Sequence, residues 1–265
     1  MQPLVADLFT AGALAGVAKD VDAAVHAASS NDERSAELDH AVVDTFIEAF
    51  AGTGKPFVYT SGLWLHGNTG DIAATEKSPF APLMVVSWRP AVEEKLADAK
   101  DMHTIRIRPG LVYDGGRGYI PMVLGPQDDG NGGKLVGHFG DGSNRWSVVH
   151  ADDLGDLYAL AVEKAPADST YLATVDEPVR VRDASKVVAN RFGATVQDWD
   201  PADAQRYWSV MVEALPARPG GDQRQSPYRT RLDPGAADSA GGARDQLIRP
   251  VTTCSGALGP RVCGL

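Results

Sequence analysis

Phe57-Val58-Tyr59-Thr60-Ser61-Gly62 is the stretch of the chain that decides the fold. It passes directly from apolar and aromatic residues into a small polar cluster, Thr60-Ser61-Gly62. A buried strand of a parallel sheet has this composition, because helices cover both of its faces. The carboxyl end of such a strand lies at the edge of the sheet where open α/β folds bind ligands. The stretch therefore predicts a strand over 57–61 that presents hydroxyl side chains to a binding site, although a core strand followed by an ordinary turn is also compatible with it.

The segments on either side complete an α/β pattern. Apolar residues at helical spacing predict an amphipathic helix over 33–50, and a second helix is predicted over 88–100. Further strands are predicted near 23–27 and 104–108, parallel to 57–61 and its neighbours or near-neighbours in the sheet. The apolar positions of the first helix are Leu38, Val42, Phe46 and Ala49, and Ala51-Gly52-Thr53-Gly54 ends it. The predicted fold class is α/β, with a doubly wound parallel sheet.

Composition limits which partners the protein is expected to bind and which cellular compartment it fits. The 265 residues carry a formal net charge of −10, which argues against nucleic acid or an anionic membrane as partner. The two cysteines, Cys254 and Cys263, both lie in the last dozen residues, so the body has no disulfide framework and fits a reducing cytoplasm. Without a histidine beside them they predict no metal site. Met1-Gln2-Pro3-Leu4 lacks the pattern of a signal peptide, and no apolar run is long enough to span a membrane.

Four segments resemble one known family, and they occur in that family's order. They are the stretch 57–67, Val25-His26-Ala27-Ala28, Ile107-Arg108-Pro109-Gly110, and the segment Trp146–Leu154, which reads Trp-Ser-Val-Val-His-Ala-Asp-Asp-Leu. Together they are similar to the NAD-dependent epimerase/dehydratase family, the extended and atypical short-chain dehydrogenases, over roughly residues 5 to 215. The resemblance implies a Rossmann-like domain over 1–215 that binds NAD or NADP.

The resemblance also assigns residues to the cofactor. An Asp-Leu pair contacts the adenine in the family, and small residues at a strand end let a dinucleotide approach the backbone. The cofactor-binding residues implied are Asp7, Leu8, His26, Ala27, Ala28, Tyr59, Thr60, Ser61, Arg89, Arg108, Pro109 and Gly110. Two ordinary interpretations stay open: His26 as a hydrogen-bonded histidine of the strand end, and 108–110 as a simple turn.

The family's catalytic pair, Tyr-x-x-x-Lys, has no counterpart in this chain. Aligning the helix on 91–93 places Arg89 in the lysine position and Val85 in the tyrosine position, and shifting the register restores neither residue. Gly62 occupies the usual Ser/Thr site, which leaves Ser61, one residue earlier, as the catalytic candidate. The chain is therefore similar to atypical members that lack the standard catalytic residues.

Substrate contacts are expected around Gly62, Trp64 and Arg145. In nucleotide-sugar epimerases an arginine near this point binds the substrate phosphate, which is one role for Arg145. A small irregular C-terminal substrate lobe is expected from about 111–147 and 170–215. In the strand-turn-helix segment that follows Arg145, Asp152 or Asp153 is expected to cap the helix.

Both ends of the chain depart from the family pattern. The G-x-x-G-x-x-G loop that holds the pyrophosphate is missing, so the sheet is predicted to lack its first βαβ unit, either by N-terminal truncation or by a misassigned start. Such a sheet would have an uncovered edge. After Pro216 the chain has an excess of glycine and proline and few aliphatic residues, so 216–265 is predicted to be a disordered tail.

The leading functional hypothesis is an NAD(P)-binding oxidoreductase or epimerase homologue that acts on a small or sugar-like substrate in the cytoplasm. A non-catalytic nucleotide-binding or regulatory protein is the first alternative, and a truncated fragment without ligand is the second. The sequence leaves open whether the chain is an enzyme, which substrate it uses, whether NAD or NADP binds, and whether it forms a homodimer.

Overall fold

A parallel five-stranded sheet forms the main domain in the computed structural model, which describes residues 3–10, 12–69, 72–114, 117–118, 120, 123–199 and 262–264. The strand order is β10-β3-β2-β1-β13, and all four neighbouring pairs are parallel. The strands are β1 (Ala23–His26), β2 (Pro56–Thr60), β3 (His103–Pro109), β10 (Ser169–Ala173) and β13 (Val262–Gly264). This confirms the predicted parallel strands as direct neighbours.

Two separate cores cover the two faces of this sheet, as the period-two alternation of a strand requires. Phe57 and Tyr59 are buried in a cluster with α1 (Ala15–Asp20), α2 (Ser35–Phe50) and α3 (Arg89–Asp98). Val58 lies in another cluster with Ile105, Ile107 and α5 (Ala151–Lys164). Helices therefore pack on both faces, and the fold is the predicted Rossmann-like, doubly wound α/β arrangement.

The helix boundaries follow local signals, with one correction. The helix α2 ends at Phe50, followed by Gly52 at φ 68° and Gly54 at φ 71°. The predicted cap of α5 was wrong: its N-cap is His150, whose ring Nδ1 accepts a 3.2 Å hydrogen bond from the backbone N–H of Asp152. Asp152 and Asp153 instead lie in the first turn, where their negative charges interact favourably with the positive end of the helix dipole.

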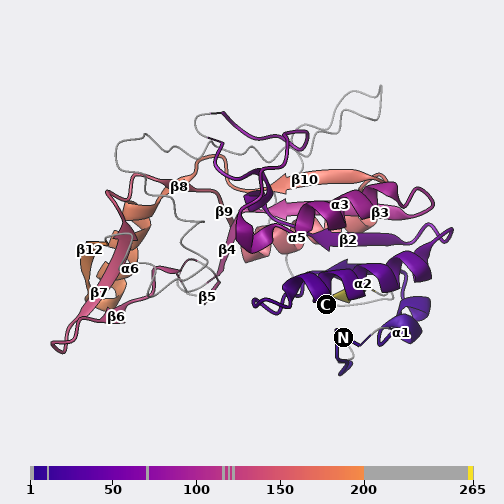
Figure 1. The fold of residues 1–265 in the computed structure, drawn as a ribbon, viewed down its shortest axis with the longest axis horizontal. Coiled ribbons are helices and arrows are strands. Elements are labelled where there is room, and N and C mark those ends of the chain that lie inside the picture. Colours follow the sequence, from indigo (N-terminus) through magenta and orange to yellow (C-terminus); the bar gives the residue numbers. More distant parts are fainter. Residues whose placement is uncertain are drawn as a thin grey trace.

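A smaller lobe lies at one end of the parallel sheet, on the left of Figure 1. Its elements are β6 (Gln127–Asp128), β7 (Lys134–Phe139), β8 (Arg145–Trp146), β11 (Val179–Arg180), α6 (Val181–Phe192) and β12 (Thr195–Trp199). Between lobe and sheet lie β4 (Leu111–Asp114), β5 (Arg117–Gly118) and β9 (Val148–His150). The strand β10 pairs with β3, so the start of the segment 170–215 belongs to the main sheet.

The two chain ends differ from the sequence expectations where they are described. Asp7 and Leu8, the pair assigned to the adenine, lie in a turn, where the Asp7 carboxylate accepts hydrogen bonds from the Phe9 N–H and the Thr10 hydroxyl. Residues 262–264 of the predicted tail form β13, which pairs with β1 and satisfies the backbone groups of that edge. The rest of the tail, with Cys254, lies outside the described residues. Within the described part of the chain, no helix has the length and apolar character that a membrane crossing needs.

Candidate functional site

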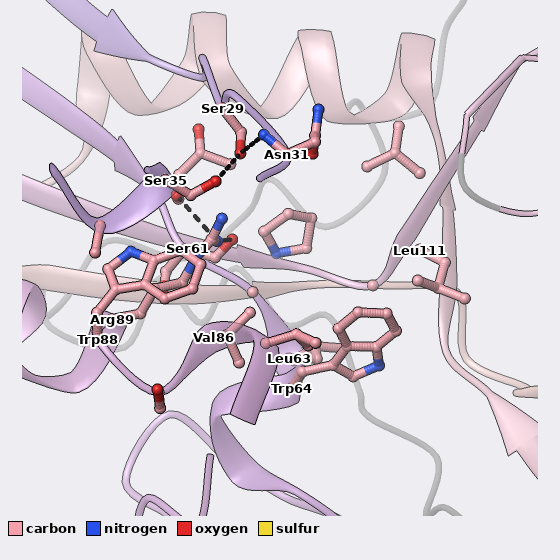
Figure 2. A pocket seen from close by; sticks show the side chains of 18 of the residues that line it. Ser29, Asn31, Ser35, Ser61, Leu63, Trp64, Val86, Trp88, Arg89 and Leu111 are labelled. Atoms are coloured by element: carbon pink, nitrogen blue, oxygen red, sulfur yellow. Dashed lines mark hydrogen bonds between the residues drawn. The ribbon is translucent and has the colours of Figure 1, made fainter. Parts of the chain in front are cut away.

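A cleft of about 1190 Å³ opens at the carboxyl ends of β1, β2 and β3 (Figure 2). Parallel pairing brings these ends together, because Val25, Val58 and Ile105 are partners in register. Small residues follow each strand and line the cleft: Ala27 and Ala28 after β1, Ser61 and Gly62 after β2, and Gly110 after β3. The cleft thus lies where open α/β folds bind ligands.

Ser61 lines this cleft between Ser29 and Asn31 on one side and Leu63 and Trp64 on the other (Figure 2). Its backbone N–H donates a 2.7 Å hydrogen bond to the Ile107 carbonyl, which continues the β2–β3 pairing past the end of the strand. The residue is 3% exposed, and its hydroxyl has no hydrogen-bond partner among the described residues. An unpaired buried hydroxyl is costly, so Ser61 Oγ keeps an unused hydrogen-bonding capacity beside the cleft.

Arg89, in the first turn of α3, contacts the same end of β2. Its Nη1 donates to the carbonyl oxygens of Thr60, at 3.4 Å, and of Ser61. Its Nε is buried and has no partner in the described part of the chain. Pro90 follows at the start of the helix, where the missing N–H of proline costs no intrahelical bond. The cleft therefore contains a permanent cation whose Nε–H is unused among the described residues.

The buried carboxylate of Asp39, on α2, lies behind the cleft lining and binds residues next to it. Asp39 Oδ1 lies 2.9 Å from His26 Nε2, and Oδ2 accepts 2.8 Å hydrogen bonds from the Tyr59 hydroxyl and the Trp88 indole N–H. Burial raises the pKa of Asp39, but the hydrogen bond from His26, the Arg89 charge and the Trp88 N–H outweigh it, so the pKa lies below its usual value. Burial also raises the pKa of Tyr59, which keeps its hydroxyl protonated and donating.

Thr60 is held from the opposite face of the sheet. Its hydroxyl lies 2.7 Å from the Tyr158 hydroxyl of α5, and burial raises the pKa of Tyr158 to about 12. The phenol is therefore a fixed structural partner at neutral pH rather than a group poised to exchange a proton.

One end of the cleft is polar and is formed by the loop between β1 and α2. Ser35 is buried at the start of α2, and its hydroxyl lies 3.1 Å from that of Ser30 and accepts from the Asp32 N–H at 3.3 Å. Asn31 adopts a φ of 54°, and its N–H donates to Ser29 Oγ at 3.2 Å. In Figure 2 the labelled Ser29, Asn31 and Ser35 lie together on one side of Ser61.

The other end is apolar. It is built by two short 3-10 helices, η1 (Leu63–His66) and η2 (Met84–Val86), together with Leu111 and Trp146. The η1 and η2 segments are tied together, because the Leu83 N–H donates to the Trp64 carbonyl at 3.2 Å. Figure 2 shows Leu63, Trp64 and Val86 on the side of Ser61 away from Ser29 and Asn31.

Arg108 is turned away from the cleft, into the interior between β3, α3 and η1. Its guanidinium pairs with the Glu93 carboxylate, with Nε at 3.0 Å from Oε1, and both side chains are at most 5% exposed. Its Nη1 also donates to His66 Nε2 at 3.2 Å. The other ring nitrogen, Nδ1, therefore carries the proton that binds the Pro79 carbonyl at 3.2 Å. Burial lowers the pKa of His66, and the neighbouring Arg108 charge lowers it further.

The structure divides the predicted site residues into two groups. Those that line the cleft are Ala27, Ala28, Thr60, Ser61, Gly62, Trp64, Arg89, Pro109 and Gly110. The others lie outside its lining: His26 and Tyr59 bind Asp39, Arg108 binds Glu93, Arg145 sits in the β8–β11 pair, Asp7 closes a turn, and Leu8 packs against the α1–α2 core.

Several lining residues were not predicted. The polar loop Ser29 to Ser35 carries a usable signal, because small polar residues follow a buried strand there. Met84–Val86, Leu111 and Trp146 carry none that distinguishes them from core residues. Among the described residues no group of three or more His, Cys, Asp or Glu side chains is arranged to hold a metal ion.

Comparison with known proteins identifies relatives of low sequence identity. No family model matches the chain. An uncharacterized protein of Schizosaccharomyces pombe is 24% identical over 206 residues, which cover 76% of this chain and 68% of the relative. An uncharacterized protein of Saccharomyces cerevisiae is 23% identical over 187 residues, which cover 69% of this chain and 60% of the relative.

Solved structures resemble the chain more extensively. A dTDP-glucose 4,6-dehydratase from Streptomyces venezuelae with NAD bound has a TM-score of 0.64 at 20% identity, covering 87% of this chain and 74% of that one. A UDP-glucose 4-epimerase from Thermus thermophilus in complex with NAD has a TM-score of 0.60 at 18% identity, covering 84% and 74%. At these identities the likeness shows that the chain has the Rossmann-like α/β fold of those enzymes.

Proposed function

We propose that this chain is an NAD(P)-binding oxidoreductase-like protein whose cofactor lies across the carboxyl ends of β1, β2 and β3. The observation that carries the proposal is the cleft itself, where small residues end adjacent parallel strands beside two unpartnered buried polar atoms, Ser61 Oγ and Arg89 Nε. NAD in the dehydratase and epimerase of the same fold supports this choice of ligand.

The residues present fit the ribose and nicotinamide parts of a dinucleotide in chemical terms. Ala27 and Ala28 offer close backbone approach, and Gly62 adds no side chain: a Cβ built there would have nothing closer than Arg89 Nη1 at 3.5 Å. The Ser61 hydroxyl and the Arg89 Nε–H are suited to ribose hydroxyl or carboxamide oxygens. When bound, the nicotinamide supplies hydride transfer.

The protein's own contribution is orientation and charge. Ser61 donates a hydrogen bond to a ligand oxygen, and the Arg89 cation stabilises negative charge that develops beside it. The apolar end excludes water from that region, which strengthens both interactions. Arg89 does not act as a proton donor, because an arginine side chain keeps its proton in proteins.

One observation favours the alternative of a non-catalytic nucleotide-binding protein. Val85 lies in the cleft lining at the position where the family resemblance places the catalytic tyrosine. A valine transfers no proton, so this alternative predicts cofactor binding without turnover of any carbonyl substrate.

Titration of the full chain with NADH and with NADPH, followed by nicotinamide fluorescence, tests the proposed function. We expect saturable binding that weakens by about tenfold or more in Ser61→Ala, which removes one hydrogen-bond donor, and in Arg89→Met, which removes the guanidinium charge and its N–H donors. Arg89→Lys keeps the charge and is expected to bind with intermediate affinity. Arg117→Met removes an arginine whose side chain is 86% exposed and lies outside the cleft lining, so it serves as the control. Absence of saturable binding to either nucleotide would refute the proposal.

A further inference from the structure

The apolar end of the cleft indicates which class of substrate would bind beside the cofactor. Trp146 and Leu111 belong to one buried cluster, and Trp64 packs against it from the η1 helix. Leu63, Val86 and the 60% exposed Met84 also line this end of the cleft. Two indoles and four aliphatic or thioether side chains thus give the cleft an apolar compartment beside Ser61.

The described lining of the cleft has three charged side chains. Asp32 and Glu33 lie on the polar loop after β1, and Arg89 borders the apolar compartment at Ser61, where its guanidinium is held by the Thr60 and Ser61 carbonyls. Phosphate recognition relies on arginine, lysine or convergent backbone donors. Indole and aliphatic walls instead favour an apolar body, which gains by leaving water.

Two buried polar atoms belong to residues of the cleft lining. Trp146 Nε1 and Ser147 Oγ are buried without a hydrogen-bond partner among the described residues, and Trp146 and Ser147 are 2% and 6% exposed. The backbone here is fixed, because the Leu111 N–H donates to the Ser147 carbonyl at 2.9 Å, and a Cβ added to Gly110 would lie 2.6 Å from that carbonyl. With Ser61 Oγ, they are hydroxyl and N–H groups of described lining residues around this end that have no hydrogen-bond partner.

From this arrangement we infer that the second ligand is a small, uncharged carbonyl compound with an apolar, ring-sized body, and not a nucleotide-diphosphate sugar. The body lies against Trp64 and Leu111, and its single oxygen accepts hydrogen bonds near Ser61. This inference rests on the proposed function, since it assigns the substrate class of the same cleft. It also separates the chain from the sugar-nucleotide enzymes that share its fold.

Saturation-transfer NMR with acetophenone and with UDP-glucose tests the inference without any turnover. We expect acetophenone to bind at least about tenfold more tightly than UDP-glucose, with and without NADH. Trp64→Ala is expected to weaken acetophenone by about tenfold, because it removes one apolar wall. Met84→Glu, at an exposed position that folding tolerates, is expected to weaken it as well. Phe192→Ala removes an exposed aromatic of α6, outside the cleft lining, and is expected to change nothing.

Two results would overturn the inference. One is UDP-glucose binding as tightly as acetophenone or displacing it, and the other is acetophenone binding that neither Trp64→Ala nor Met84→Glu weakens. NADH titration of the same samples keeps the two proposals apart. NADH binding without ketone binding defeats only the substrate class, whereas ketone binding without NADH binding defeats only the cofactor assignment.

Discussion

Trp88 donates its indole N–H to Asp39 Oδ2 across 2.8 Å, and this hydrogen bond ties the start of α3 to the buried face of α2. Since Trp88 and Arg89 are adjacent and both line the cleft, the bond positions the cation of the site. Asp39 also binds His26 and Tyr59, so one carboxylate connects β1, β2, α2 and α3. The cleft wall therefore depends on a residue that does not itself reach the cleft.

Replacing Asp39 is expected to destabilise the fold. Asp39→Asn replaces the carboxylate that accepts from His26, Tyr59 and Trp88 by a neutral amide with only one acceptor oxygen. We therefore expect the free energy of unfolding to fall by about 2–4 kcal/mol. Asp44→Asn, on the same helix but with a 54% exposed side chain paired to Lys95, should cost less than about 1 kcal/mol. Urea denaturation measures both, and equal losses would contradict the account.

The lowered pKa of Asp39 also makes the stability of the fold depend on pH in a defined direction. A carboxyl whose folded pKa is depressed contributes stability above its unfolded pKa and loses it as pH falls through the folded pKa. The wild type is therefore expected to lose stability on acidification below about pH 4, the ordinary aspartate value, more steeply than Asp39→Asn. Parallel acid titrations of both proteins by circular dichroism test this, and coincident curves would count against it.

Arg108 is predicted to matter for stability and not for cofactor affinity. Because its guanidinium faces Glu93 and His66, Arg108→Met leaves a buried carboxylate unpaired and is expected to cost about 3–5 kcal/mol. Adding Glu93→Leu removes the stranded charge and is expected to restore much of that loss. In the restored double variant, NADH affinity should match the wild type within about twofold. A large drop in affinity there would return Arg108 to the cofactor site.

His66 makes the η1 region sensitive to mild acid. Its folded pKa is lowered, so between that value and the ordinary histidine pKa of about 6.5 the unfolded chain binds the extra proton, and stability falls as pH decreases. We expect the wild type to lose more stability than His66→Gln between about pH 7.5 and about pH 5.5. Guanidinium denaturation at both pH values decides this, and a pH dependence unchanged in His66→Gln would contradict it.

Gly67 is expected to be irreplaceable for two reasons. It adopts φ 60° and ψ −145°, a region that essentially only glycine occupies, and a Cβ there would lie 2.3 Å from the Ala81 carbonyl oxygen. Gly52 has a similar φ of 68° but open space around its Cβ position. Gly67→Ala should therefore lower the free energy of unfolding by at least about 1 kcal/mol more than Gly52→Ala. Comparable thermal midpoints for the two variants would disprove the steric part.

Much of the fold follows from local patterns. The run from Phe57 to Gly62 identifies a buried parallel strand, and the helical spacing of Leu38, Val42 and Phe46 identifies the helix that covers it. Once the strands are parallel, their carboxyl ends must meet, so the amino-acid sequence alone assigns the small residues after β1, β2 and β3 to one cleft.

The features of the site that could not be predicted depend on contacts between residues far apart in the sequence, or on which face of a strand a side chain occupies. Asp39 looks like an ordinary helix residue, since its partners His26, Tyr59 and Trp88 lie 13, 20 and 49 residues away. The family resemblance assigns Arg108 to the cofactor, yet strand alternation places it on the face opposite Ile107 and α5, toward α3 and Glu93. The apolar end of the cleft draws on both lobes, which no local pattern brings together.

The most direct test of the central claim is where the nicotinamide dinucleotide binds. Of the five tryptophans, Trp64, Trp88 and Trp146 line the cleft, whereas Trp199 is buried in the small lobe and Trp208 lies outside the described residues. Indole N–H resonances of ¹⁵N-tryptophan-labelled protein, assigned by single Trp→Phe variants, report on each residue separately. We expect saturating NADH to shift the Trp88 resonance, through its place beside Arg89, and to leave Trp199 unchanged. A shift confined to Trp199 or Trp208, or no shift at all, would contradict a cofactor site at the carboxyl ends of β1, β2 and β3.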